Sequence, residues 1–276
     1  MKQTDGRASE QTRRRLCLGA VLGALALAFA PLPAQARDLV VYGEPTLAPV
    51  LHSLGALWRA KGNSRVHVFT APTDLSFEQI ARDVRCDVIV ALAGPATDAA
   101  EERELFDADS KIVAFGNSLV LVARAPWVAV PGGLHAILAG KGLAIANSDR
   151  DVAGSYTLQA LRAAGVSVDP AGKDLRVAEN TTGVLQMLAD GHADIGVVYA
   201  TDAAANPEFK LVARFDADSY PSIVYVAAQA AHADDDADTE GFIDFLTTPE
   251  AKAAIAAAGL TPAGRKTAQA RSSNAR

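Results

Sequence analysis

Short runs rich in β-branched residues alternate with longer stretches rich in alanine and leucine from residue 38 almost to the end of the chain. The short runs have the length of strands. The longer stretches repeat their apolar residues every three or four positions, as in Leu158, Leu161 and Ala164, which is typical of helices. Alternation of this kind indicates an α/β fold, in which helices cross over between parallel strands. We therefore expect an α/β fold with mostly parallel sheets.

This pattern predicts ten strands and six longer helices. The strand ranges are 38–42, 65–70, 87–92, 111–114, 118–123, 143–146, 174–177, 195–199, 210–214 and 223–227, and the helical ranges are 46–60, 74–84, 153–164, 181–190, 240–247 and 249–258. Threonines stand at or near several helix starts, where a hydroxyl can cap the backbone. Glycines close several helix ends.

The first 36 residues have the features of a secretory signal peptide. Three arginines at 13–15 precede an apolar run over 16–32, and Ala34-Gln35-Ala36 then supplies a cleavage pattern. The run is shorter than the roughly 20 apolar residues that a membrane-spanning helix needs. The arginines also fit a twin-arginine signal. We expect export to the periplasm and cleavage after Ala36, with either export route open.

Cleavage would leave an acidic chain. The signal segment holds five basic and two acidic residues, so 21 Lys or Arg and 30 Asp or Glu would remain, a net charge of −9. A nucleic-acid-binding protein needs a basic surface, so we expect no nucleic-acid partner. Cys17 would leave with the signal peptide, and Cys86, which has no partner for a disulfide, is expected to be a core thiol.

The motifs of common enzyme classes are absent from the sequence. Neither HExxH nor CxxC occurs, and the five histidines are scattered. Gly116-Asn117-Ser118 begins like a nucleophile elbow, but Val120 stands where the second glycine is needed. We therefore expect no catalytic residues, no cofactor and no direct metal ligands. An exported enzyme is kept as an alternative.

Four predicted helix starts carry small or hydroxyl-bearing residues, and each follows a strand. They are residues 45–47, 72–74, 152–155 and 180–182. In open α/β sheets the ligand binds outside the carboxyl ends of the strands, where helix starts present unpaired N–H groups that suit an anion. The alternative is that these residues only cap their helices, and that Tyr199 is an ordinary strand residue.

Several segments resemble the molybdate-binding proteins of ABC transporters. They are Phe115–Arg124, Ala144–Tyr156, Gly196–Ala203, Asp218–Tyr225 and Phe242–Ala251, which follow one another in the order of that family. The similarity covers residues 38–262 and is weaker before residue 110. It implies a two-lobed periplasmic binding protein of type II with a two-segment hinge.

The resemblance also implies which residues hold the ligand. Thr46 and Thr73 occupy the places of two family serines, and Ala153 matches the alanine of an Ala-Gly pair. Thr181 falls on a family valine, and Tyr199 on a family tyrosine. These five residues are expected to bind a tetrahedral oxyanion, molybdate or tungstate.

Two acidic residues depart from the family pattern beside these positions. Glu44 stands where the family has a small residue, and Asp74 directly follows Thr73. A carboxylate that faces a bound dianion would repel it. Either both side chains point outward, or the solute is a different one that carries a cationic group.

The resemblance further implies lobes and partners. Lobe one would comprise residues 37–120 and 221–276, and lobe two residues 121–220, with crossings near 121–124 and 218–223. The closed protein would deliver its oxyanion to the membrane permease of an ABC transporter, and we expect a monomer. Binding of another small solute, or signalling to a partner instead of delivery, are the alternatives within this fold.

Overall fold

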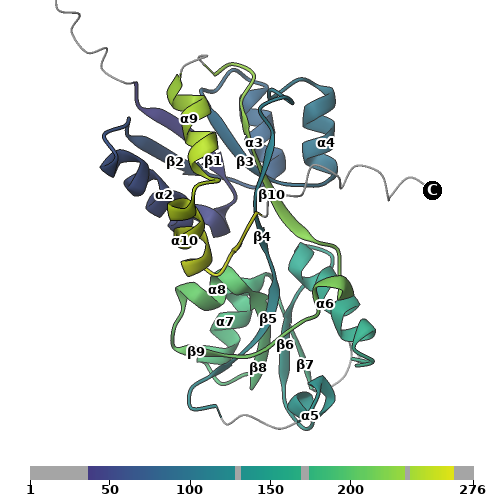
Figure 1. Ribbon diagram of the computed structural model, residues 1–276. Coiled ribbons are helices and arrows are strands. Elements are labelled where there is room, and N and C mark those ends of the chain that lie inside the picture. The colour runs from purple at the N-terminus through teal and green to yellow at the C-terminus, as the bar shows by residue number, and fades with distance from the viewer. Residues whose placement is uncertain (1–36, 128–131, 169–173, 234–236, 264–276) are drawn as a thin grey trace, which may run out of the picture. The chain divides into compact units, whose positions relative to one another are not determined.

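A computed structural model describes residues 37–127, 132–168, 174–233 and 237–263. The described residues form two sheets with helices packed against them (Figure 1). The predicted signal peptide, residues 1–36, lies outside the described residues. Among the described residues, no helix has both the length and the apolar composition needed to cross a membrane.

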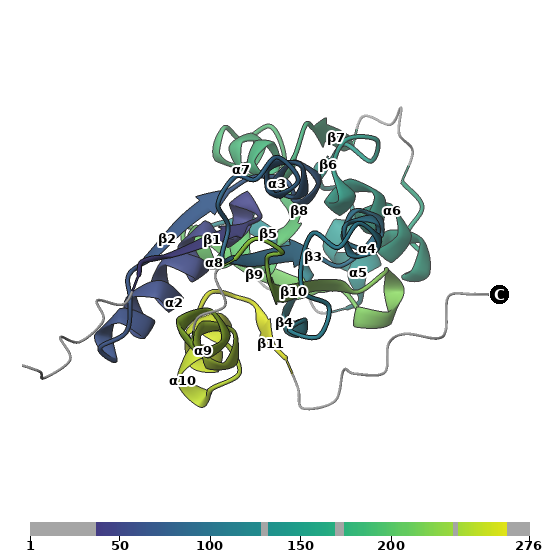
Figure 2. The same ribbon diagram turned by 90° about the horizontal axis from the view of Figure 1, so that it is seen from above.

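The first sheet has six strands in the order β11-β4-β10-β3-β1-β2. These are β1 (Leu39–Gly43), β2 (Val66–Thr70), β3 (Val88–Leu92), β4 (Ile112–Asn117), β10 (Ile223–Gln229) and β11 (Thr261–Pro262). The accompanying helices are η2 (Pro45–Leu47), α2 (Ala48–Ala60), α3 (Thr73–Ile80), α4 (Pro95–Glu102), α9 (Ala237–Phe245) and α10 (Pro249–Ala257). Helices α2, α9 and α10 cover one face of this sheet, and α3 and α4 cover the other (Figure 2).

The second sheet has five strands in the order β7-β6-β8-β5-β9. These are β5 (Leu119–Arg124), β6 (Leu143–Ala146), β7 (Leu175–Ala178), β8 (Ile195–Tyr199) and β9 (Phe209–Arg214). The helices here are α5 (Leu134–Leu138), α6 (Val152–Ala163), α7 (Thr181–Ala189), α8 (Ala200–Ala205) and η3 (Ala217–Ser219). Helix α7 packs on one face of this sheet, and α5 and α6 pack on the other.

Both sheets are mixed, so the prediction of mostly parallel sheets was wrong. Strand β1 is parallel to β2 and β3, and β6 is parallel to β7 and β8. In contrast, β10 is antiparallel to both β3 and β4, and β11 is antiparallel to β4. In the second sheet, β5 is antiparallel to both β8 and β9. Strands β5 and β10 enter directly from the other sheet, without the crossover helix that keeps neighbouring strands parallel.

The chain passes between the sheets twice. Strand β4 of the first sheet ends at Asn117 and β5 of the second begins at Leu119, so the first passage lies at Ser118. The first passage therefore comes before the predicted range 121–124. The apolar residues continue from β4 into β5, so the sequence does not show where the chain leaves the first sheet. The second passage lies between β9 and β10, where the Tyr220 hydroxyl accepts a hydrogen bond of 3.0 Å from the Leu119 backbone N–H. The lobe boundaries given above stay a prediction.

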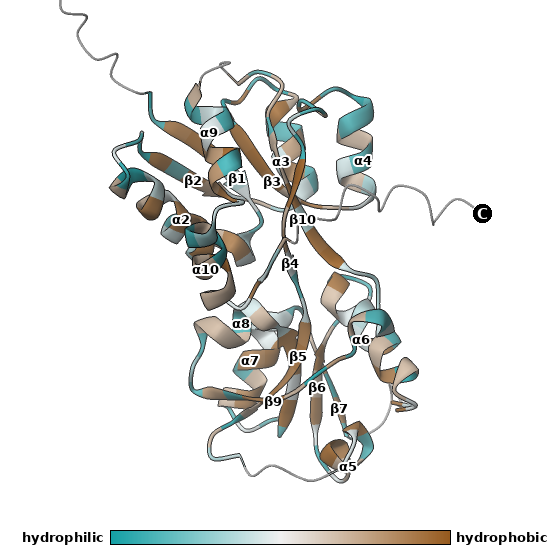
Figure 3. Ribbon diagram, in the orientation of Figure 1, coloured by the Kyte–Doolittle hydropathy of each residue, from teal (hydrophilic) through white to brown (hydrophobic). Residues whose placement is uncertain are grey.

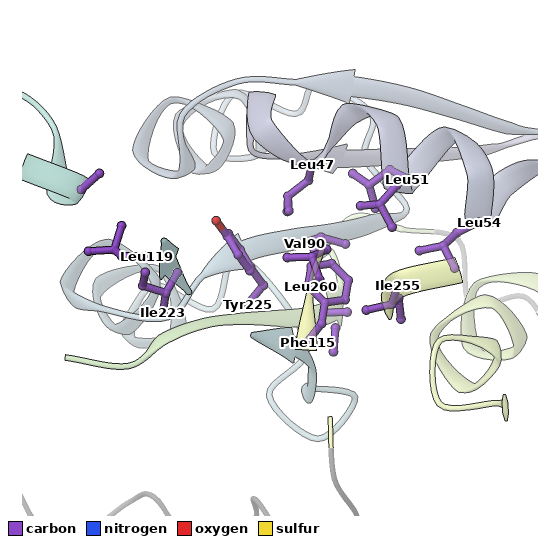
Figure 4. Close-up of a cluster of buried hydrophobic side chains, with 14 of the residues drawn as sticks. Leu47, Leu51, Leu54, Val90, Phe115, Leu119, Ile223, Tyr225, Ile255 and Leu260 are labelled. Atoms are coloured by element: carbon purple, nitrogen blue, oxygen red, sulfur yellow. The ribbon is translucent and has the colours of Figure 1, made fainter. Parts of the chain in front are cut away.

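The core forms on both faces of the first sheet, because successive strand residues point to opposite sides. Val88 and Val90 pack with the apolar residues of α2, whereas Ile89 packs with Phe77 and Ile80 of α3. Figure 4 shows leucines of η2 and α2 facing Val90 and its neighbours from β4, β10 and α10. The strands of both sheets are accordingly among the most hydrophobic segments (Figure 3).

Gly154 allows α6 to start close to the end of β6. A Cβ atom added at this glycine would lie 2.6 Å from the carbonyl carbon of Asn147, so no larger residue fits without backbone movement. The close approach sets the position of the first turn of α6. Gly133, at the start of α5, has open space where its Cβ would be.

We expect Gly154→Ala to destabilise the protein by about 1–3 kcal/mol, the usual cost of overpacking a tight contact. Gly133→Ala is the matched control and should stay within about 0.5 kcal/mol of the wild type. Denaturant unfolding of the three proteins checks this. Equal stability of Gly154→Ala and Gly133→Ala would contradict the close packing of α6 on β6.

Candidate functional site

The five residues that the sequence assigns to the ligand all lie where a strand ends and a helical turn begins. Thr46 is in η2 after β1, and Thr73 begins α3 after β2. Ala153 is the second residue of α6, Thr181 begins α7, and Tyr199 ends β8. The chain therefore places them at the edges of the sheets where α/β proteins bind ligands.

Thr73 does not cap its helix. The N-cap position of α3 is Pro72, and the Thr73 side chain is buried. Its hydroxyl donates to Oε1 of Glu44 and accepts a hydrogen bond of 3.1 Å from the backbone N–H of Leu92 in β3. Thr73 thus connects the loop after β1 to β3, through a hydroxyl that already has two partners.

Glu44 points into the site, toward the start of α3. Its Oε1 accepts both the Thr73 hydroxyl and the Thr73 backbone N–H, the latter at 2.8 Å. Burial raises the pKa of the Glu44 carboxyl, the bonds from Thr73 lower it, and the nearby Asp74 raises it further. Asp74 itself is exposed, and its Oδ1 accepts the Leu75 backbone N–H at 2.9 Å. Of the two acidic departures, Glu44 is therefore the one that faces the predicted ligand residues.

Thr46 lies against a tyrosine that the sequence did not single out. The hydroxyl of Tyr225, in β10, lies within hydrogen-bonding reach of the side chains of Thr46 and Asn117. Burial raises the pKa of Tyr225 to about 12, so this phenol stays protonated at neutral pH. Asn117 also donates to the Thr201 hydroxyl at 3.1 Å, which links the end of β4 to α8.

Ala153 presents its backbone N–H to a carboxylate of the same helix. Asp151 is the N-cap residue of α6, and its Oδ1 accepts the Ala153 N–H at 2.8 Å. Ala153 is fully buried, backbone included, and its N–H is held by Asp151.

Thr181 is buried and lies within hydrogen-bonding reach of Asp202. The Asp202 carboxylate also accepts the Tyr199 backbone N–H at 3.2 Å. Burial raises the pKa of Asp202, against these two hydrogen bonds, which lower it. The pKa of the Tyr199 hydroxyl is raised as well, mainly by burial and further by the charge of Asp151.

The Tyr199 hydroxyl interacts with polar groups that come from both sheets. Four groups act on its hydroxyl electrostatically, namely Asp151, Tyr225, Asp202 and Glu44, and they come from both sheets. Each of the other four predicted residues contacts one of these groups: Thr46 contacts Tyr225, Thr73 contacts Glu44, Ala153 contacts Asp151, and Thr181 contacts Asp202. All five predicted residues are thus linked to one set of four polar groups that come from both sheets.

A cavity of about 610 Å³ opens beside these groups. Thr46, Thr201 and Asp202 line it, together with small residues of α8 and α10, whereas Thr73, Ala153, Thr181 and Tyr199 do not. The described residues contain no group of three or more His, Cys, Asp or Glu side chains that could hold a metal ion. The chemistry that the site offers is therefore hydrogen bonding by hydroxyl, backbone and carboxyl groups.

Asp202, Tyr225 and Asn117 were not identified from the sequence. Asp202 lies in α8, which at six residues is too short to show helical periodicity. Tyr225 and Asn117 lie inside β10 and β4, where the sequence pattern shows strands but not which side chains reach the other sheet. The position of Asp202, three residues after Tyr199 and directly after a strand, is a signal that could have found it.

Residues 39–261 match the model of a known family, described as bacterial extracellular solute-binding protein. The chain belongs to this family. Extracellular solute-binding proteins are not enzymes as a family, so the match agrees with the absence of catalytic motifs from this sequence.

Relatives of this solute-binding protein include one from Escherichia coli K12, named molybdate-binding protein ModA. It is 27% identical over 83% of this chain and 90% of its own length. Among solved structures, a substrate-binding domain from Clostridium difficile has a TM-score of 0.74, with 19% identity over 82% of this chain and 99% of that one. The periplasmic molybdate-binding protein of Azotobacter vinelandii has a TM-score of 0.65, with 21% identity over 82% and 100% of the two chains. These structures confirm the two-lobed fold of type II.

We expect Thr73→Ala to lower the free energy of unfolding by about 1–3 kcal/mol, because it leaves the Leu92 N–H without its acceptor and removes one of the two hydrogen bonds from Thr73 to Glu44. Thr73→Ser keeps the hydroxyl and should stay within about 0.5 kcal/mol of the wild type. Denaturant unfolding at neutral pH is the measurement. A Thr73→Ala protein as stable as Thr73→Ser would show that the buried hydroxyl contributes nothing.

Proposed function

We propose that this protein captures a tetrahedral oxyanion, molybdate or tungstate, in the periplasm and delivers it to the membrane permease of an ABC transporter. The observation that supports the proposal is that Thr46, Thr73, Ala153, Thr181 and Tyr199 are each linked to one set of polar groups that come from both sheets. The name of the Escherichia coli relative, molybdate-binding protein ModA, adds support.

The oxyanion would be held by hydrogen bonds and not by lysine or arginine. Hydroxyls of Thr46, Thr73 and Tyr199 and backbone groups at Ala153 and Thr181 would donate to its oxygen atoms, with no bond to the central metal. A hydrogen bond to a charged group contributes about 1.5–3 kcal/mol, so several of them suffice for tight capture. The protein would act as a monomer, without a cofactor and without catalysis.

Closure of the two lobes would complete the site. Thr46 and Thr73 belong to elements of the first sheet, and Ala153, Thr181 and Tyr199 to elements of the second. An oxyanion that bonds to both groups holds the lobes together, and the chain passages at Ser118 and between β9 and β10 would serve as the hinge. The closed form is the one that the permease would recognise.

A second candidate is a small solute with a cationic or hydrogen-bond-donating group. Three carboxylates, those of Glu44, Asp151 and Asp202, lie close enough to the Tyr199 hydroxyl to act on its pKa. Carboxylates accept hydrogen bonds and attract cations, so this observation favours a ligand that can donate.

We expect molybdate and tungstate to stabilise the mature protein against heat, by about 2.7 kcal/mol at a hundredfold excess over the dissociation constant. A thermal-shift series with molybdate, tungstate, phosphate and small organic amines measures this. Stabilisation by the amines and not by molybdate or tungstate would contradict the oxyanion proposal and favour the second candidate, a cationic solute.

We expect Thr46→Ala to weaken molybdate binding by about 1.5–3 kcal/mol, because one hydrogen bond to the anion is lost. Ser53→Ala is the matched control: Ser53 lines the same cavity, but its hydroxyl donates to the Pro49 carbonyl of its own helix at 3.0 Å. Calorimetric titration of both variants should find unchanged affinity in Ser53→Ala. Equal molybdate affinities of the two variants would show that Thr46 does not bind the ligand.

A further inference from the structure

The donors at the start of α3 are already held by an internal anion. The Thr73 hydroxyl and the Thr73 backbone N–H both point to Oε1 of Glu44. These are the groups that the proposed function assigns to an oxygen atom of the ligand. In this structure the Glu44 carboxylate therefore lies where an oxyanion would have to bind.

Glu44 differs from the other two carboxylates of the site. Asp151 caps its own helix, and Asp202 accepts the backbone N–H of Tyr199, three residues before it. Each of these two carboxylates holds a backbone N–H at the start of its own helix, and Asp202 also lies near Thr181 of α7. Glu44 instead reaches across 29 positions of sequence to another element. The Glu44 side chain does not cap the helical turn that Glu44 itself begins, and an oxyanion bound to the Thr73 donors would have to replace its carboxylate.

We propose that Glu44 is the residue that determines the specificity of this site, and that it does so by making oxyanion capture depend on the uptake of one proton. The proposal rests on the function proposed above. A protonated Glu44 accepts hydrogen bonds less strongly, which frees the Thr73 hydroxyl for the ligand. It also becomes a donor itself, so a group that would repel the oxyanion now binds it.

The surroundings of Glu44 favour this protonation. Glu44 interacts electrostatically with three titratable groups: Asp74 of α3, Tyr199 of β8 and Tyr225 of β10. None of them carries a positive charge that would hold the carboxylate in its ionised form. Burial and Asp74 raise its pKa in the free protein, and a dianion bound beside it would raise the pKa again. At pH values between the Glu44 pKa of the free protein and the Glu44 pKa of the complex, the protein takes up a proton when it binds the ligand. In that range the affinity rises as the pH falls.

Calorimetric titration with molybdate tests the proposal in the mature protein. Titrations over a pH series, each in two buffers of different ionisation heat, should show that the wild type takes up as much as one proton. The uptake should be greatest between the pKa of Glu44 in the free protein and its raised pKa in the complex, and the affinity should rise as the pH falls through that range, by at most about tenfold per pH unit. E44Q keeps the shape and an acceptor for Thr73 but cannot titrate. It should take up no proton, bind with the same affinity throughout the series, and bind more tightly than the wild type at the upper end of it.

D74N is the matched control, because it removes the neighbouring exposed charge and leaves Glu44 in place. Because Asp74 raises the pKa of Glu44, D74N should still take up a proton on binding, over a pH range that lies lower than that of the wild type. Proton uptake that persists in E44Q, or molybdate binding by the wild type with no proton uptake, would overturn the role of Glu44 and leave the proposed function standing. Binding of neither molybdate nor tungstate at millimolar concentration by the wild type and E44Q would instead overturn the proposed function. If E44Q does not fold, molybdate binding by the wild type and D74N without proton uptake still overturns the role of Glu44.

Discussion

A buried hydrogen bond between the Leu119 backbone N–H and the Tyr220 hydroxyl ties together the two passages of the chain between the sheets. Leu119 is the first residue of β5, and Tyr220 lies just before β10, so the bond joins segments 101 positions apart. Beside it, Asn117 holds Thr201 of α8. The mixed sheets and the meeting of helix starts from both of them follow from these passages. A ligand site made from two sheets depends on the chain crossing here, and not at the outer ends of the strands.

The hydrogen-bond donors of the site are paired with acceptors of the protein itself. Donors that suit an oxyanion, at Thr73, Ala153 and Thr181, are each met by a carboxylate. A buried donor without an acceptor costs free energy, so this pairing stabilises the free protein. It also makes capture an exchange of one anion for another. Affinity is then set by the difference between an internal carboxylate and the oxyanion, which is why a single acidic residue can determine which solute binds.

Much of this arrangement could be predicted from the sequence, and the failures have local causes. The ten expected strands each overlap a strand of the structure, because β-branched runs between helical stretches are a strong signal. Helices α4, α5 and α8 were missed, and for α5 and α8 the reason is that five or six residues are too few to show helical periodicity. The direction of β5 and β10 depends on contacts between distant segments, which no local pattern contains. For the same reason the sequence could raise the question of Glu44, but only the fold places its carboxylate on Thr73.

The most direct test of the account is a crystal structure of the mature protein grown with tungstate, located by the anomalous scattering of tungsten. We expect a single strong peak between the two sheets, with the oxygen atoms of the anion in hydrogen-bonding distance of Thr46, Thr73, Ala153, Thr181 and Tyr199. A peak held by other residues, or no peak between the sheets at saturating tungstate, would contradict the central claim that these residues capture a tetrahedral oxyanion.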